Sequence, residues 1–231
     1  MANVKITCEW GVHGLNNDAD VLIIVDTLSF STCVDIIVNN NAIVFPYPYK
    51  DESAIAYAAE KNAILALPRN KPGYTLSPTS LINIPENTKL VLPSPNGSTL
   101  AFKATALHIL AGCLRNASSI ALAAMNLGKR ISVLPAGEKW SDGSIRISYE
   151  DLIGAGAIIH ELTGDKTAEA IIASKMFIDS YQQQFKNIYD LHSGLELVSW
   201  GFQNDINLAC QYNISTGVPI LQHGFFTKLK I

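Results

Sequence analysis

Residues 21–25 (VLIIV) form an uninterrupted apolar run that ends at Asp26. The run is too short for a typical helix, and it has no polar positions that could face water on one side of a sheet. It therefore predicts a strand buried on both faces. Strands of this kind occur in parallel sheets that carry helices on both sides, so this segment alone points to an α/β fold.

Short apolar runs recur along the chain and are separated by stretches with helical spacing. Further strands are predicted at 42–45, 63–67, 89–92, 108–111 and 131–134, and helices at 51–61, 116–127, 149–162, 167–186 and 206–212. Another helix should follow Asp26, with Ser31 or Thr32 as its N-cap. This alternation predicts mostly parallel or mixed sheets with flanking helices. We expect one compact α/β unit over 1–231, with two lobes at about 1–95 and 96–231 as the alternative arrangement.

Composition and charge restrict the partners. The 231 residues are 48% hydrophobic and 16% charged, and 17 basic against 20 acidic side chains give a net charge of −3. The chain is too apolar to be disordered, and its charge offers no basic surface for nucleic acid or an anionic membrane. Its apolar runs are too short to span a bilayer, and the first residues lack the apolar segment of a secretory signal. We expect a cytoplasmic protein, with a homodimer as one form open to it.

Asp26 is the first candidate functional residue, because ligands of α/β sheets bind beyond the carboxyl ends of the strands. A carboxylate at the end of a buried strand needs a cation, a metal ion or several hydrogen-bond donors to offset its desolvation. Asp26 is thus a candidate metal ligand or nucleophile. The alternative is an aspartate that accepts hydrogen bonds from the first N–H groups of the next helix.

A polar loop follows the strand predicted at 89–92 and leads into a helix. Asn96–Gly97 favours positive φ, and consecutive N–H groups that run into a helix start can form an anion-binding nest. Ser94, Ser98 and Thr99 add hydroxyl donors. The alternative is an ordinary β-turn followed by a Ser or Thr helix cap.

Acidic residues also follow the strand predicted at 131–134. Glu138 comes first, and Asp151 stands next to Glu150 at the start of the helix predicted at 149–162, where carboxylates also interact favourably with the helix dipole. Together with Asp26, Glu138 and Asp151 would supply the hard oxygen ligands that Mg²⁺ prefers. Gly154 and Gly156 within the same helix suggest close packing or close approach of a ligand.

Four segments, taken in order, resemble the 2-phosphosulfolactate phosphatase family: VLIIVDTLSFSTCVDIIVNNNA, LVLPSPNGSTL, LPAGEKWSDGSIRISYEDLIGAGAII and HSGLELVSWGFQNDINLACQYNISTGVPIL. The resemblance implies a two-lobed α/β fold and a Mg²⁺-dependent acid phosphatase of coenzyme M biosynthesis. The reaction of that family is the hydrolysis of 2-phospho-3-sulfolactate to sulfolactate and phosphate.

The sequence departs from the family pattern at two places. Ser29 stands where the family usually has Arg, and a Gly-Glu-Arg-x-Gly segment is represented only by Arg69 within 67–71. A bidentate Arg is difficult to replace at an anion site, because Lys or a hydroxyl does not reproduce its planar fork. Three alternatives follow: another cation binds the anion, the substrate differs, or activity is lost. The candidate cations are Arg69, Lys71, Lys139 and Arg146.

The sequence therefore suggests a Mg²⁺-dependent phosphomonoester hydrolase. In this hypothesis Asp26 and Asp151 hold the metal, with Glu138 near or in its coordination shell. Arg69 clamps the substrate, and the phosphoryl oxygens are bound by Ser94, Asn96, Gly97, Ser98 and Thr99. The nucleophile is left open between Asp26 and a water molecule. The alternative is a degenerate family member that binds a small anion or a nucleotide without turnover.

Overall fold

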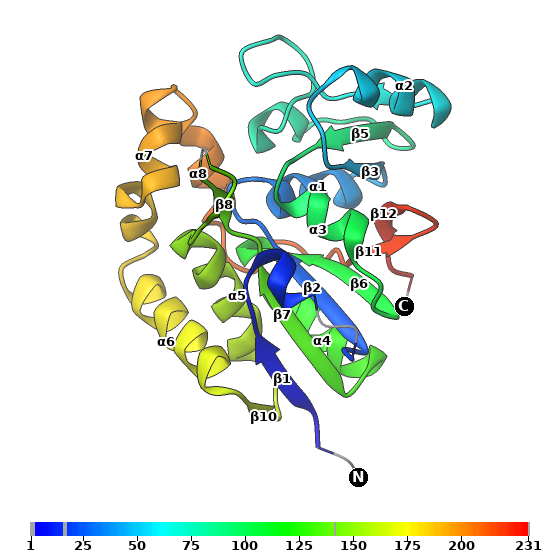
Figure 1. The fold of residues 1–231 in the computed structure, drawn as a ribbon. Helices are drawn as coiled ribbons and strands as arrows, with labels where there is room; N and C mark the ends of the chain where they lie inside the picture. Colours follow the sequence, from blue (N-terminus) through cyan, green and yellow to red (C-terminus); the bar gives the residue numbers. More distant parts are fainter. Residues whose placement is uncertain (1–2, 16–17, 141, 231) are drawn as a thin grey trace.

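The computed structural model describes residues 3–15, 18–140 and 142–230. Within them, ten strands form one sheet in the order β10-β1-β7-β2-β6-β11-β12-β3-β5-β4 (Figure 1). These strands are β1 (Lys5–Cys8), β2 (Val21–Val25), β3 (Ile43–Tyr47), β4 (Ile64–Leu65), β5 (Lys89–Pro93), β6 (His108–Gly112), β7 (Arg130–Pro135), β10 (Asp165–Lys166), β11 (Pro219–Gln222) and β12 (Phe225–Lys228). A separate hairpin consists of β8 (Glu138–Lys139) and β9 (Ile145–Arg146).

Eight α-helices accompany the strands in the described residues. They are α1 (Phe30–Asn39), α2 (Glu52–Glu60), α3 (Gly97–Lys103), α4 (Ala117–Leu127), α5 (Tyr149–Glu161), α6 (Ala168–Gln182), α7 (His192–Ser199) and α8 (Gln203–Ala209). A large, mostly parallel sheet flanked by helices confirms the predicted α/β fold.

The sheet consists of two parallel halves joined by a hairpin. β10, β1, β7, β2 and β6 form the first half, and β3, β5 and β4 form the second half. The hairpin of β11 and β12 pairs antiparallel with β6 on one side and with β3 on the other. Three successive antiparallel pairings therefore reverse the direction of the second half relative to the first. Strands of the first half stand both before β3 (β1 and β2) and after β5 (β6, β7 and β10) in the chain, so the halves are not consecutive sequence blocks. The division near residue 95 stays a prediction.

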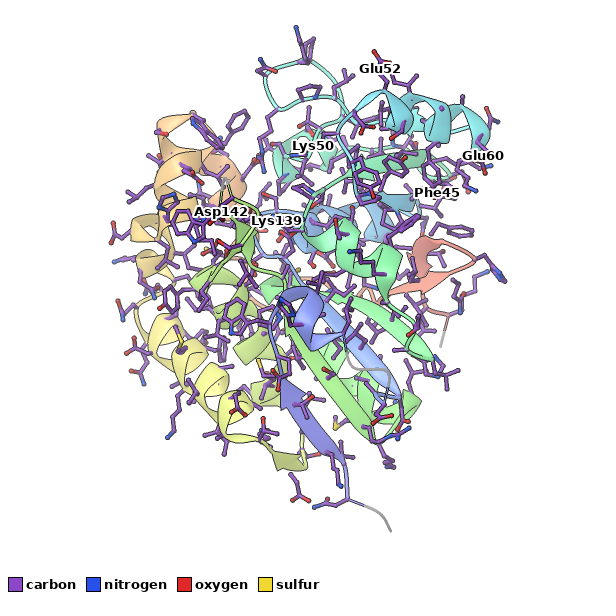
Figure 2. All side chains as sticks on the ribbon, in the orientation of Figure 1. Phe45, Lys50, Glu52, Glu60, Lys139 and Asp142 are labelled. Atoms are coloured by element: carbon purple, nitrogen blue, oxygen red, sulfur yellow. The ribbon has the colours of Figure 1, made fainter. Side chains whose placement is uncertain are left out.

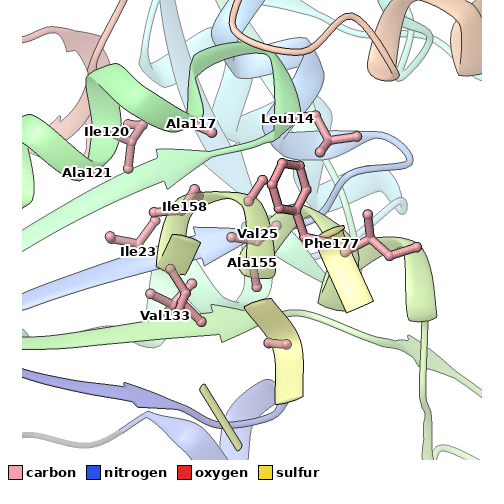
Figure 3. Close-up of a cluster of buried hydrophobic side chains, with 14 of the residues drawn as sticks. Ile23, Val25, Leu114, Ala117, Ile120, Ala121, Val133, Ala155, Ile158 and Phe177 are labelled. Atoms are coloured by element: carbon pink, nitrogen blue, oxygen red, sulfur yellow. The ribbon is translucent and has the colours of Figure 1, made fainter. Parts of the chain in front are cut away.

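β2 shows why the apolar run at 21–25 is continuous. All five of its side chains are buried, and they alternate between two cores. Ile23 and Val25 pack with residues of α4, α5 and α6 on one face (Figure 3), whereas Leu22 and Ile24 pack with α1 and α3 on the other. Burying apolar surface on both faces fixes β2, and thereby Asp26 at its carboxyl end.

The two glycines within α5 are explained by close packing. A Cβ on Gly156 would lie 2.0 Å from the backbone oxygen of Ala173 in α6, and a Cβ on Gly154 would lie 2.5 Å from Oγ1 of Thr27. Both distances are shorter than the contacts that Cβ atoms make in proteins, so side chains at these positions would push α5 away from its neighbours. The packing interpretation is confirmed, and the close approach of α5 to residue 27 bears on the site described below.

Several predicted boundaries were wrong. The helix after Asp26 begins at Phe30, and its N-cap is Ser29 rather than Ser31 or Thr32. Ser31 does not cap the helix, because its hydroxyl donates to the carbonyl of Ile24. The helix predicted at 206–212 lies at Gln203–Ala209 instead, and α7 and the β11–β12 hairpin were not predicted. In the part of the chain that the structure describes, no helix is both long and apolar enough to cross a membrane.

Candidate active site

A cavity of about 290 Å³ lies where carboxyl ends of strands from both halves meet. β2 and β7 lead into it with Asp26 and Glu138, and β3 and β5 lead into it with Lys50 and Asn96. The lining is predominantly polar and comprises Asp26, Leu28, Ser29, Lys50, Arg69, Leu76, Ser94, Pro95, Asn96, Glu138, Arg146, Ser193, Glu196, Leu197 and Trp200. Each half thus contributes residues at the carboxyl ends of its strands, which is where ligands of α/β sheets bind (the strand-end rule).

Asp26 is held from both sides of its carboxylate. Oδ1 accepts a hydrogen bond from the N–H of Phe30 at 3.0 Å, and Oδ2 accepts one from the N–H of Gly97 at 2.9 Å. Burial raises the pKa of Asp26, and these two hydrogen bonds oppose that shift because they stabilise the charged form. Asp26 accepts a hydrogen bond from the first N–H of α1, as the capping alternative predicted, and it also lines the cavity. Its role as a metal ligand or nucleophile stays a prediction.

Glu138 is the second acidic side chain in the cavity lining. Its Oε2 accepts a hydrogen bond from Nδ2 of Asn96 at 2.7 Å, which joins the loops after β7 and β5. Burial, and secondly the charge of Asp26, raise the pKa of Glu138 to about 7. A carboxyl group with such a pKa can both donate and accept a proton at neutral pH.

Asp151 lies behind the cavity and is not part of its lining. Its Oδ1 accepts a hydrogen bond from the N–H of Thr27 at 2.7 Å, and its Oδ2 accepts one from the N–H of Gly137 at 3.0 Å. Burial and the charges of Asp26 and Glu150 raise the pKa of Asp151 well above its usual range. In the structure Asp151 connects the segments that follow β2 and β7, and its role as a metal ligand stays a prediction.

The loop 94–99 differs from the expected cradle. Ser94 and Asn96 line the cavity, but Gly97 gives its N–H to Asp26. The hydroxyl of Ser98 donates to the carbonyl of Leu92 at 2.8 Å, and that of Thr99 donates to the carbonyl of Pro95 at 2.7 Å. The structure therefore gives Gly97, Ser98 and Thr99 partners within the protein and leaves them outside the lining of this cavity.

Three cationic side chains line the cavity. Arg69 and Arg146 were among the candidates named from the sequence, whereas Lys50 was not recognised. Lys50 lies three residues after β3, so the strand-end rule would have found it had it been applied to that strand. Burial lowers the pKa of Lys50. Lys50 also lines a neighbouring cavity, together with Lys139 of β8, which does not line this one; Figure 2 labels both lysines.

Arg69 supplies a guanidinium next to the residue where the family pattern has Arg. Its Nη2 donates to Oγ of Ser29 at 2.7 Å, and its Nη1 donates to Oδ2 of Asp205 at 2.5 Å. On the other side of the cavity, Nη2 of Arg146 lies 3.6 Å from Oε2 of Glu196. The arginines are only 19% and 10% exposed, so both cations are partly desolvated and attract anions more strongly than surface charges do.

The carboxylates of the site fit a hard divalent cation in charge and donor type. Mg²⁺ is usually bound by one or two carboxylates, with water and substrate phosphate as its other ligands, and Asp26 and Glu138 are carboxylates that line the cavity. Among the residues that the structure describes, no group of three or more His, Cys, Asp and Glu side chains is arranged to hold a metal ion. A cation at Asp26 would therefore take most of its ligands from water and substrate.

The buried carboxylates predict how stability depends on pH in the metal-free protein. The pKa values of Asp26, Glu138, Glu150 and Asp151 are all raised, that of Glu138 from 4.5 to about 7. The folded state therefore retains protons that the unfolded chain has released, so the free energy of unfolding falls as pH rises between about 4.5 and about 7.

We expect Tm in the presence of EDTA to be at least about 3 °C higher near pH 5.5 than near pH 7.5, a shift that corresponds to roughly 1 kcal/mol in a chain of this size. Glu138→Gln, which cannot titrate, should make this dependence shallower. A Tm that rises with pH over this interval would contradict the electrostatic description of the site.

Comparisons with known proteins identify the family of this chain. The family model described as 2-phosphosulpholactate phosphatase matches residues 12–224. A probable 2-phosphosulfolactate phosphatase of Pseudothermotoga lettingae is 26% identical over 215 residues, covering 90% of this chain and 92% of the relative. A 2-phosphosulfolactate phosphatase of Methanothermobacter thermautotrophicus is 29% identical over 140 residues, covering 58% of this chain and 57% of the relative. The family match takes in Asp26, Arg69 and Glu138, and the chain belongs to the 2-phosphosulfolactate phosphatase family.

Proposed function

We propose that this protein is a Mg²⁺-dependent phosphatase that hydrolyses 2-phosphosulfolactate to sulfolactate and phosphate. The observation that carries the proposal is a cavity lined both by three cations, Lys50, Arg69 and Arg146, and by the carboxylates of Asp26 and Glu138. A substrate with phosphate, sulfonate and carboxylate groups needs several cations, because the net charge of −3 offers no long-range attraction. The names of the relatives support this choice of substrate.

Arg69 and Arg146 bind and orient the substrate in this proposal. Each guanidinium can bind two oxygens of a phosphate, sulfonate or carboxylate group at once. Because both are partly buried, the bound anion exchanges water for fixed donors whose positions do not change during the reaction. Lys50 adds a third positive charge next to Asp26.

Asp26 is the proposed anchor for Mg²⁺, which when bound would neutralise the charge that develops on the phosphoryl oxygens. The two backbone N–H groups on its carboxylate hold it in one orientation and reduce its nucleophilicity. These contacts favour water over Asp26 as the nucleophile.

Glu138 is the proposed proton carrier. Protonated near neutral pH, it would donate its proton to the ester oxygen as the bond from phosphorus to that oxygen breaks. Glu138 would then accept the proton lost by the attacking water. The alcohol and phosphate leave, and the carboxyl group of Glu138 is protonated again. Asn96, 2.7 Å from Oε2, fixes the orientation of the side chain during both transfers.

Phosphate release from 2-phosphosulfolactate by the purified protein tests this function. We expect release with Mg²⁺, its loss on addition of EDTA, and slower release from phosphomonoesters that lack a second acidic group. In thermal denaturation, Mg²⁺ and inorganic phosphate together should raise Tm more than the sum of their separate effects. The reason is that phosphate would be a ligand of the bound Mg²⁺, so each would strengthen the binding of the other. No release from 2-phosphosulfolactate or from a panel of small phosphomonoesters would contradict the proposal.

A family member that binds a small anion without turnover is the second candidate. This candidate was suggested by Ser29, which stands where the family usually has Arg. The guanidinium of Arg69 donates a hydrogen bond to Ser29, however, and this contact favours an anion site with an arginine in place. Stabilisation by phosphate or sulfolactate without any hydrolysis would support this second candidate over the first.

A further inference from the structure

We propose that Asp205 is a positioning residue that orients the guanidinium of Arg69 toward the active-site cavity. This role rests on the proposed function, since it assigns Arg69 to substrate binding. Asp205 lies in the first turn of α8, is 1% exposed and does not line the cavity that contains Asp26. It would therefore act on the substrate only through Arg69.

The side-chain contacts of Asp205 come from Arg69 and from the segment 77–79. Its Oδ2 accepts the hydrogen bond from Nη1 of Arg69. Its Oδ1 accepts hydrogen bonds from Oγ of Ser77 at 2.7 Å, from N of Thr79 at 3.1 Å and from Oγ1 of Thr79 at 2.7 Å. The three donors of Ser77 and Thr79 hold the carboxylate independently of Arg69 and leave Oδ2 to accept from the guanidinium.

Arg69 is thereby held on three sides. Nη1 is bound to Asp205, Nη2 donates to Ser29, and the guanidinium carbon lies 5.3 Å from the centre of the Phe202 ring. Two of its five N–H groups are used in these hydrogen bonds, and the other three have no hydrogen-bond partner among the described residues. A guanidinium fixed in this way loses little side-chain entropy when an anion binds.

The alternative is a purely structural role, in which Asp205 only ties α8 to residues 77–79. A double-mutant cycle separates the two roles, because residues that act through one another are non-additive. The variants are Asp205→Asn, Arg69→Ala and the double variant, and the readouts are the Kd of inorganic phosphate by calorimetry, KM, kcat and Tm.

We expect Asp205→Asn to raise the phosphate Kd and KM by about tenfold or more, with a smaller effect on kcat. In the Arg69→Ala background the same substitution should change the phosphate Kd less than about twofold. Ser77→Ala, which removes one hydrogen bond but keeps the charge of Asp205, should shift the Kd in the same direction by a smaller factor, and it serves if Asp205→Asn does not fold.

Guanidinium ion at millimolar concentration gives a readout that a structural role would not change. It should partly restore activity to Arg69→Ala, because Asp205 and Ser29 still offer it their acceptors, and it should fail in the double variant. Rescue of both variants to the same extent would overturn the positioning role.

Asp35→Asn is the matched control. Asp35 is also a fully buried aspartate paired with an arginine, Arg115, at 2.9 Å, but neither residue lines the cavity. The control should lower Tm and leave the phosphate Kd unchanged.

Two outcomes distinguish the failure of this role from the failure of the proposed function. If the wild-type protein releases phosphate but the effects of Asp205→Asn and Arg69→Ala multiply, the positioning role is overturned and the function stands. If the wild-type protein neither binds nor releases phosphate, the function falls and the role falls with it.

Discussion

Asp26→Asn is expected to lower kcat for phosphate release by a factor on the order of 10³. The substitution keeps the size of the side chain but removes the negative charge at the end of β2, which is the proposed anchor for Mg²⁺. It also replaces one acceptor by an NH₂ group that faces a backbone N–H, either of Phe30 or of Gly97. Steady-state kinetics at saturating Mg²⁺ measures the effect.

The folded state should tolerate this substitution. Removing a buried charge relieves its desolvation and the repulsion that raises the pKa values of Glu138 and Asp151. This gain offsets the mismatched hydrogen bond, so we expect a Tm within a few degrees of the wild type. Asp35→Asn, at a residue that does not line the cavity, should keep its activity and serves as the control for the loss of a buried carboxylate. A fully active Asp26→Asn would remove the central residue of the proposed mechanism.

Asp151→Ala is expected to lower the free energy of unfolding by about 2–6 kcal/mol, because it leaves two buried N–H groups, those of Thr27 and Gly137, without an acceptor. Asp151→Asn should cost less, since its amide oxygen still accepts one of the two hydrogen bonds. Denaturant unfolding measured by circular dichroism gives both values.

The same pair of variants tests whether Asp151 is a metal ligand. If its role is to connect the segments after β2 and β7, Asp151→Asn should retain an unchanged dependence of activity on Mg²⁺ concentration. A large rise in the Mg²⁺ concentration needed for half-maximal activity, with unchanged stability, would instead favour Asp151 as a ligand.

Residues fixed by local patterns were predictable from the sequence. The apolar run before Asp26 predicted both the buried strand and the position of the carboxylate at the cavity, because these depend on burial and strand direction alone. Glu138 was found by the same rule after β7. The β11–β12 hairpin was missed because its pairing with β6 and β3 depends on strands distant in sequence.

The partners of polar side chains were less predictable. The hydroxyls of Ser98 and Thr99 suggested an anion cradle, but tertiary structure places carbonyl groups within their reach. Asp205 showed no distinguishing pattern in the sequence, because its importance comes from donors on a different segment, at Ser77 and Thr79. A sequence specifies which groups can form hydrogen bonds, and the fold decides whether the partner is another residue or a ligand.

The β11–β12 hairpin also has a consequence for the order of events during biosynthesis. It is synthesised after every other strand of the sheet, yet it alone joins β6 of the first half to β3 of the second (Figure 1). Phe226 of β12 contacts Phe30 at the start of α1, with ring centres 6.1 Å apart, directly after the loop that carries Asp26. On the ribosome, therefore, the two halves can form their own pairings first, and they become one sheet only when the hairpin has emerged.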